Sequence, residues 1–199
     1  METMKPRIQI LKILLKDVLA IPTITFLAKE LSISRVGAWK ILKKLEEEKL
    51  VVLSSIGSGK TSTYIVRLNW DNIILEKTLS LALTQDSIKS RRWLNNFAEL
   101  ENKLDFLIIY GSILQNQKDA RDIDILGVTN KTNFLAIEES IKKIQKTQLK
   151  KIHSINFTQK ELKSELEKSN KAFIDALKKG IILFGQEKFI KFMKSITRR

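Results

Sequence analysis

The spacing of apolar residues predicts three helices in the first fifty residues. Residues 5–18 carry apolar side chains three and four positions apart, as in an amphipathic helix. Pro22 and Thr23 suit a helix start, so a second helix is expected from there to about residue 31. Ser34 suits the N-cap position and predicts that a third helix begins directly after it.

The third predicted helix has one apolar face and one basic face. The residues on its apolar face are Ala38, Ile41, Leu42 and Leu45. The residues on its outer face are Arg35, Trp39, Lys40, Lys43 and Lys44. After this helix, two β-branched runs at residues 50–55 and 62–68 flank a glycine-containing turn, which predicts a β-hairpin.

Three helices followed by a hairpin resemble a winged helix-turn-helix domain, and the resemblance covers residues 5–69. It implies that the third helix binds double-stranded DNA. The residues implied as DNA contacts are Ser34, Arg35, Trp39, Lys40, Lys43, Lys44 and, in the wing, Lys60. Two alternatives stay open: a protein-binding winged helix, and a lysine-rich face that is merely solvated. Trp39 suits packing against the wing as well as contact with a partner.

The hairpin turn contains a stretch, Ser54 to Thr61, that is similar to the end of a phosphate-binding loop. The position of the first glycine in that motif is occupied by Ser54, and the following residues favour a strand rather than a helix. The sequence therefore predicts a wing tip in which Gly57 and Gly59 form the turn and Lys60 reaches a DNA phosphate.

Composition narrows the classes of function. The 36 Lys and Arg residues exceed the 22 Asp and Glu residues, giving a net charge of +14, which favours polyanionic partners or, alternatively, a solubilising surface. The chain has no cysteine, which excludes disulfides, thiol nucleophiles and cysteine zinc sites. Its single histidine, His153, lies in an apolar run, so we expect core or surface filler and no histidine-based metal cluster. Without an apolar run of about 18 residues or a signal-peptide pattern, we expect a cytoplasmic protein that does not bind membranes.

Residues 105–130 combine two predicted strands with residues suited to bind a metal and a phosphate. The apolar run 106–110 ends at Gly111 and Ser112, where the backbone and a hydroxyl suit phosphate oxygens. The second strand places Asp122 and Asp124 on one face, about 7 Å apart along the strand. Two such carboxylates repel each other unless a cation such as Mg²⁺ (or Mn²⁺) lies between them.

This segment resembles the nucleotidyltransferase superfamily with the polymerase-β-like fold. The matching residues are Tyr110, Gly111-Ser112, nine intervening residues, and Asp122-Ile123-Asp124-Ile125. The resemblance covers residues 90–190 and is nearest in size to the minimal nucleotidyltransferases of archaea and bacteria. It implies that Asp122 and Asp124 are catalytic and bind Mg²⁺, that Gly111 and Ser112 contact the triphosphate of an NTP, and that a further strand at 150–157 and a helix follow. The resemblance leaves open a toxin-type partner protein, which is known for some minimal members.

The chain departs from the family pattern in three places. The strand expected to supply a third metal-binding carboxylate offers only His153, Ser154 and Asn156, of which Asn156 suits a weak metal bond through its carbonyl. Residues 113–117 replace a small-basic-glycine sequence, and Arg121 replaces a frequent serine. Either Lys118 and Arg121 compensate for lost phosphate contacts, or they are solvated loop residues.

The sequence thus predicts an α+β protein with an N-terminal winged helix at 1–70, a helical connector at 71–95 and a small mixed-sheet nucleotidyltransferase-like domain at 96–199. The first hypothesis for its function is Mg²⁺-dependent transfer of a nucleotidyl group from an NTP to an unknown hydroxyl acceptor. The alternative is a DNA-binding transcriptional regulator whose second domain is degenerate and serves as a nucleotide sensor or dimerisation module. A homodimer is expected because winged-helix proteins commonly dimerise.

Overall fold

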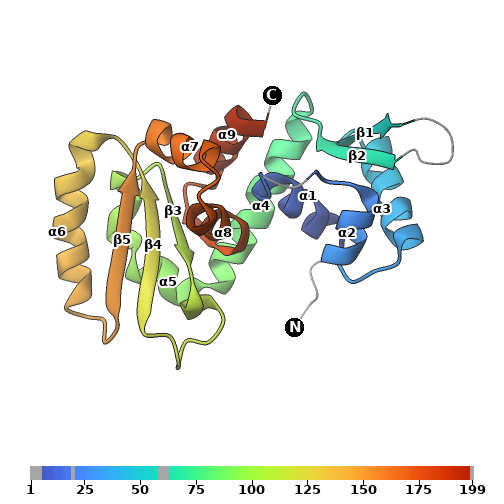
Figure 1. Cartoon of the computed structure of the whole chain (residues 1–199). Coiled ribbons are helices and arrows are strands. Elements are labelled where there is room, and N and C mark those ends of the chain that lie inside the picture. The colour runs from blue at the N-terminus through green and yellow to red at the C-terminus, as the bar shows by residue number, and fades with distance from the viewer. Residues whose placement is uncertain (1–5, 19–20, 58–62, 198–199) are drawn as a thin grey trace. The chain divides into compact units, whose positions relative to one another are not determined.

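The computed structural model describes residues 6–18, 21–57 and 63–197. The chain divides into two compact units, Met1–Ala82 and Leu83–Arg199, which we call the first and second units (Figure 1). The chain is of the α+β class, with an N-terminal helical part and a mixed sheet, as the sequence predicts at this level. Among the described residues, no helix combines the length and the apolar character needed to cross a membrane.

The first unit contains three helices and a two-stranded hairpin, in the order that the apolar pattern predicts. Its elements are α1 (Pro6–Lys16), α2 (Ile24–Glu30), α3 (Arg35–Glu47), β1 (Val51–Ile56) and β2 (Thr63–Leu68), followed by α4 (Ile73–Lys89), which runs across the division between the units. The predicted helix starts are confirmed: the hydroxyl of Thr23 accepts a hydrogen bond from the amide of Phe26, and that of Ser34 accepts one from the amide of Gly37. These bonds satisfy amides that lack a partner within the helix.

The core of the first unit forms where the predicted apolar faces meet. On α3, Ala38, Leu42 and Leu45 are fully buried. They share this core with Leu15 and Leu27, which come from the first two helices. The strands β1 and β2 pair in antiparallel register, and the described residues after the turn, from Thr63 to Leu68, form a strand where a phosphate-binding loop would continue into a helix.

The second unit is built around a four-stranded sheet with the strand order β5-β4-β3-β6. Its strands are β3 (Phe106–Tyr110), β4 (Asp122–Val128), β5 (Lys151–Phe157) and β6 (Ile181–Phe184). Its helices are α5 (Arg91–Asn96), α6 (Phe134–Gln145), α7 (Gln159–Glu167), α8 (Lys171–Lys179) and α9 (Gln186–Thr197), with short 3₁₀ turns η2 (Ala98–Lys103), η3 (Ser112–Leu114) and η4 (Lys131–Asn133). Strands β4 and β5 are parallel and α6 connects them, whereas β3 is antiparallel to both of its neighbours.

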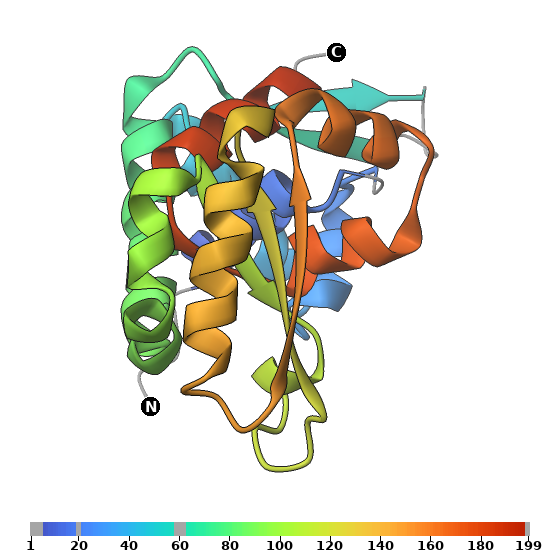
Figure 2. The same ribbon diagram turned by 90° about the vertical axis from the view of Figure 1, so that its left-hand side faces the viewer.

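Helices cover both faces of the sheet. On one face, Phe97, Leu100 and Ile137 form a core with the inward residues of the strands, and Figure 2 shows α6 lying across this face. On the other face, Phe106 of β3 packs edge-on against Phe189 of α9, with ring centroids 5.4 Å apart. This burial on both faces explains the nearly continuous apolar character of β3.

The sequence predicts one helix after β5, whereas the structure has two helices, α7 and α8, between β5 and β6. The helical conformation is interrupted after α7 by Ser169, which has a φ of 57°. The side chain of Asn170 then caps α8 by accepting a hydrogen bond from the amide of Ala172. At the start of α7, Thr158 and Glu161 form a reciprocal capping box. The pKa of Glu161 is lowered to about 2. The main cause is the hydrogen bond that its carboxylate accepts from the backbone amide of Thr158, and the next is the one that it accepts from Lys131.

Gly185, directly after β6, lies in the left-handed region with φ +76°. A Cβ atom at this position would lie 2.0 Å from the carbonyl oxygen of Asp105 and 2.7 Å from the Cα of Phe106. The close approach brings the end of β6 against the start of β3, so the position requires glycine for both conformation and space.

Candidate metal centre

The start of β4 carries two carboxylates on the same face of the sheet. Asp122 and Asp124 alternate with Ile123 and Ile125, which are buried on the opposite face, so the predicted two-residue alternation is confirmed. The Asp122 side chain is 31% exposed and the Asp124 side chain 25%. Both carboxylates are therefore partly desolvated but still accessible to a ligand from solution.

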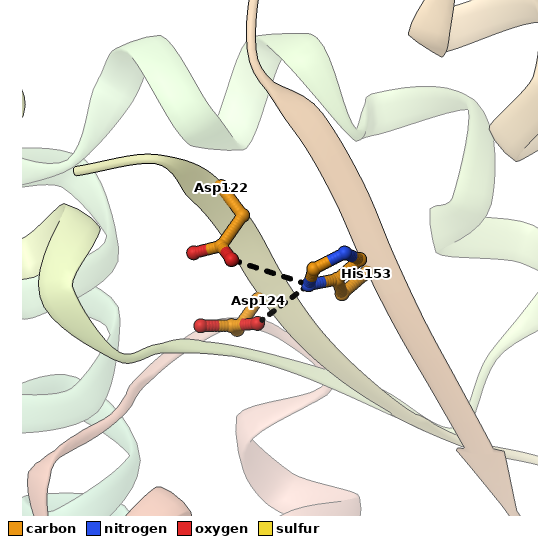
Figure 3. Close-up of side chains that lie close together, drawn as sticks. All are labelled: Asp122, Asp124 and His153. Carbon is orange, nitrogen blue, oxygen red and sulfur yellow. Dashed lines mark ion pairs between the residues drawn. The ribbon is translucent and has the colours of Figure 1, made fainter.

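His153 on β5 lies beside the two carboxylates. The parallel register pairs Asp124 with His153, and paired residues of adjacent strands project from the same face. The Nδ1 atom of His153 is 3.4 Å from Oδ2 of Asp122 and 3.5 Å from Oδ1 of Asp124. Figure 3 shows the two carboxylates and the imidazole turned toward one another. One ligand atom from each side chain lies within 4.8 Å of the other two, a grouping suited to a metal ion.

The interpretation of His153 as filler missed this arrangement. The side chain is 45% exposed and faces the aspartates, so it does not fill the core. The sequence does predict a strand at 150–157, and this strand is the signal that could have placed His153 beside the aspartates. What the sequence does not reveal is the parallel register that sets this residue opposite Asp124.

Ser154 and Asn156 of β5 lie on the opposite face of the sheet, whereas Lys151, which pairs with Asp122, lies on the same face as the aspartates. Ser154 pairs with Ile125 and Asn156 with Gly127, both one position out of phase with the aspartates. A Cβ atom on Gly127 would lie 2.6 Å from Oδ1 of Asn156, which confirms that Asn156 projects away from the carboxylates. The suggestion that Asn156 binds the metal is therefore wrong, because the alternation of the strand directs its carbonyl elsewhere.

Burial and mutual repulsion shape the electrostatics of the carboxylates. The pKa of Asp124 is raised, mainly because the carboxylate is partly buried and also because Asp122 places a second negative charge beside it. His153 acts in the opposite direction and lowers this pKa. Tyr110, which pairs with Asp124 across β3 and β4, also has a raised pKa, because of burial and then of Asp124. A cation bound between the aspartates would relieve this unfavourable concentration of negative charge.

The turn after β3 brings the backbone against Asp124. Gly111 has φ +83°, and a Cβ atom there would lie 2.4 Å from Oδ2 of Asp124. Ser112 begins the 3₁₀ turn η3 and is exposed, so its hydroxyl is accessible. The structure therefore brings the predicted residues Gly111, Ser112, Asp122 and Asp124 to one end of the sheet.

The loop between η3 and β4 carries the two basic residues considered as phosphate contacts. The side chains of Lys118 and Arg121 are exposed. The backbone carbonyl of Lys118 accepts a hydrogen bond from Nζ of Lys150 at 3.2 Å, and that of Ala120 accepts a second one. Lys150 thus fixes the loop by its main chain and leaves the basic side chains of the loop available to solvent.

Comparisons with protein-family models, with curated proteins and with solved structures found no match. The donor set itself therefore supplies the argument about chemistry. Two carboxylates and an imidazole nitrogen fit a divalent cation, and the backbone that approaches Asp124 leaves no room for a side chain at Gly111.

Apart from Lys60, the residues predicted to contact DNA lie on α3 or at its N-cap. Arg35, Lys40 and Lys44 are exposed, and Ser34 caps the helix with its hydroxyl. Lys60 lies outside the described residues.

Trp39 packs against the hairpin. Its ring centroid is 5.1 Å from that of Tyr64 on β2. The Nζ of Lys43 lies 5.1 Å from the Trp39 ring and also pairs with Glu46 at 2.7 Å. Of the two roles considered for Trp39, the structure thus supports packing against the hairpin, and Lys43 is already engaged by neighbours on its own helix.

Proposed function

We propose that the second unit is a metal-dependent nucleotidyltransferase, which transfers a nucleotidyl group from an NTP to a hydroxyl acceptor. One observation carries the proposal: Asp122 and Asp124 lie on one face of β4, and the backbone of Gly111 lies directly against Asp124. This places two metal-binding carboxylates next to a turn that can approach a phosphate group.

In this proposal the two aspartates hold a divalent ion, which when bound neutralises negative charge at the reacting phosphate. The acceptor hydroxyl gives up its proton to solvent water, its oxygen forms a bond to the α-phosphorus, the bond from this phosphorus to the bridging oxygen breaks, and pyrophosphate leaves. The Gly111 amide and the Ser112 hydroxyl orient the triphosphate. Such transfer depends mainly on positioning and electrostatics, which the edge of a rigid sheet can supply.

The arrangement of the sheet supports the resemblance drawn from the sequence. A strand that ends in Gly-Ser pairs in antiparallel register with the Asp-Ile-Asp strand, and a third strand runs parallel to the latter. Binding of NTP, a homodimer, a toxin-type partner and a cytoplasmic location stay predictions of the sequence.

The test of the proposal is label transfer from α-labelled NTPs to the protein itself and to RNA, with a divalent ion present. The Asp122→Asn, Asp124→Asn double variant is expected to transfer at least about 10²-fold less label, because it keeps the side-chain shapes but removes both charges. Equal labelling by the wild-type and double-variant proteins would refute the proposed site.

A second function, binding of duplex DNA by the first unit, is favoured by the exposed cations on α3. Arg35, Lys40 and Lys44 are exposed on a helix whose apolar face is buried, so their charges are available to phosphates. This geometry supports a winged-helix interpretation of the three helices and the hairpin. DNA binding and nucleotidyl transfer are compatible within one chain.

Removing the three α3 cations together is expected to weaken binding to duplex DNA by about tenfold or more near 0.1 M salt. The plot of log K against log salt has a negative slope, and each lost phosphate contact makes this slope less steep by about 0.9. The matched control removes three exposed lysines of the second unit: Lys146, Lys171 and Lys191. Fluorescence anisotropy over a salt series measures both quantities, and similar losses in the two triple variants would show a general charge effect instead of docking through α3.

A further inference from the structure

The imidazole of His153 is placed as a ligand and not as a tightly bonded partner of either aspartate. Its Nδ1 is 3.4 Å from one carboxylate oxygen and 3.5 Å from the other. Charge-assisted hydrogen bonds are shorter, about 2.7–2.9 Å. Two ligand atoms that each lie about 2.1 Å from a common metal ion are instead separated by about 3.0–3.4 Å. The observed separations are close to those between neighbouring ligands of one ion.

The position of this nitrogen is fixed by the sheet. His153 is registered opposite Asp124 by the parallel pairing of β4 and β5, and both aspartates come from a single strand. Ile152, the residue before His153, is buried and anchors β5 in the core. The nitrogen ligand is thus provided by a neighbouring strand of the same sheet, whose register keeps the three donors close together.

A nitrogen donor changes which ions the site prefers. Mg²⁺ is a hard ion that takes oxygen ligands and gives up its waters reluctantly. Imidazole suits borderline ions such as Co²⁺ and Zn²⁺, which bind nitrogen more strongly than Mg²⁺ does. Among the described residues, Asp122, Asp124 and His153 form the one grouping of three such side chains that can share an ion, and one of its three donors is nitrogen.

We propose that His153 is the third ligand of a metal centre with Asp122 and Asp124, and that this centre selects a borderline divalent ion, of the Co²⁺ or Zn²⁺ class, over Mg²⁺. The inference rests on the proposed function in one respect, namely that the same ion serves nucleotidyl transfer. It replaces the expectation of a magnesium enzyme with that of an enzyme matched to a nitrogen-binding metal.

The single histidine allows a direct test on the wild-type protein. In ¹⁵N-labelled protein all imidazole ring signals belong to His153. Titration with ZnCl₂ is expected to shift its Nδ1 resonance and to saturate at one ion per chain, whereas MgCl₂ at the same concentrations leaves the ring signals unchanged. Ring signals that do not move at saturating Zn²⁺ would overturn the assignment of His153 as a ligand.

Calorimetric titrations of variants test the selectivity. His153→Ala is expected to lose about 10–100-fold in Co²⁺ and Zn²⁺ affinity, with Mg²⁺ affinity changed less than about threefold. His153→Asp, which makes the donors all oxygen, is expected to shift the preference toward Mg²⁺. Asn156→Ala, on the same strand but the opposite face, is the matched control and should bind like the wild type. Tighter binding of Mg²⁺ than of Co²⁺ and Zn²⁺ by the wild type would overturn the proposed selectivity.

Failure of this inference and failure of the proposed function give different results. Label transfer that proceeds with Mg²⁺ and is unaffected in His153→Ala would refute the role of His153 and leave the nucleotidyltransferase proposal intact. Zn²⁺ coordination by His153 without label transfer in the presence of Zn²⁺, Co²⁺, Mn²⁺ or Mg²⁺ would support the metal centre and refute the proposed reaction. Loss of transfer in His153→Ala with unchanged metal affinities would show that the imidazole acts on the reactants and is not a ligand.

Discussion

Replacing Gly185 with alanine is expected to destabilise the second unit by about 3–5 kcal/mol, the range of strongly disruptive single substitutions. The backbone of Gly185 is in the left-handed region, which costs an L-residue about 1–2 kcal/mol. The added Cβ would also lie 2.0 Å from the carbonyl oxygen of Asp105, and a backbone atom cannot rotate aside as a side chain can. The end of β6 would therefore have to move away from β3.

Urea unfolding followed by circular dichroism measures this effect. Gly37→Ala is the control, because Gly37 lies inside α3, where alanine is favoured over glycine by about 1 kcal/mol. Its Cβ would meet only the Ser34 hydroxyl, at 3.2 Å. A Gly185→Ala protein as stable as the wild type would mean that the two strands do not approach each other as closely as described.

Asp124→Asn is expected to reduce nucleotidyl transfer by about 10²–10³-fold, yet to raise the melting temperature of the protein in EDTA. The loss follows from removing a charge that would hold the metal ion against the developing negative charge of the phosphate. The gain follows because partial burial and the charge of Asp122 make the ionised form of Asp124 unfavourable in the folded protein, as its raised pKa indicates.

The pH dependence of this gain has a definite sign. The folded state holds the proton of Asp124 more tightly than the unfolded state, whose pKa is near the ordinary value of 3.8. The resulting stabilisation is fully present below pH 3.8 and is lost as pH rises through the raised pKa. The stability difference between Asp124→Asn and the wild type should therefore be smallest in acid and grow to a plateau toward neutral pH.

Asp175→Asn serves as the control for Asp124→Asn. Its carboxylate is 59% exposed and pairs with Lys179 at 3.1 Å on the surface of α8, so its removal should change neither transfer nor the pH profile appreciably. An Asp124→Asn protein that is less stable than the wild type at neutral pH, in EDTA, would contradict the electrostatic description of the site.

Local features of the fold are predictable because neighbouring residues determine them. The apolar spacing on α3 and the caps at Thr23 and Ser34 depend on contacts within one helix turn. The alternation at Asp122 and Asp124 is likewise a property of one strand. For this reason the sequence is sufficient to place both aspartates on the same face and Gly111 at the end of the preceding strand.

The role of His153 depends on pairing between strands that are distant in the sequence. A shift of β5 by one residue would turn His153 toward the core and present Ser154 or Asn156 to the aspartates. Nothing in the residues of β5 alone distinguishes these registers, because polar side chains occur on both faces of the strand. The contact of Trp39 with Tyr64 on the hairpin is undetermined by sequence for the same reason.

The contact between Gly111 and Asp124 also constrains which residues can replace them during evolution. Because a Cβ at position 111 would overlap the Asp124 carboxylate, chains that retain the acid are under pressure to retain the glycine. A lineage that loses the acid to a smaller residue is freed from the steric half of this constraint, but the backbone at position 111, with φ 83° and ψ −162°, still requires glycine unless the turn itself changes. Among homologous chains, loss of glycine at position 111 should therefore occur only where the acid at position 124 is also lost, and it would mark lineages that have abandoned the centre.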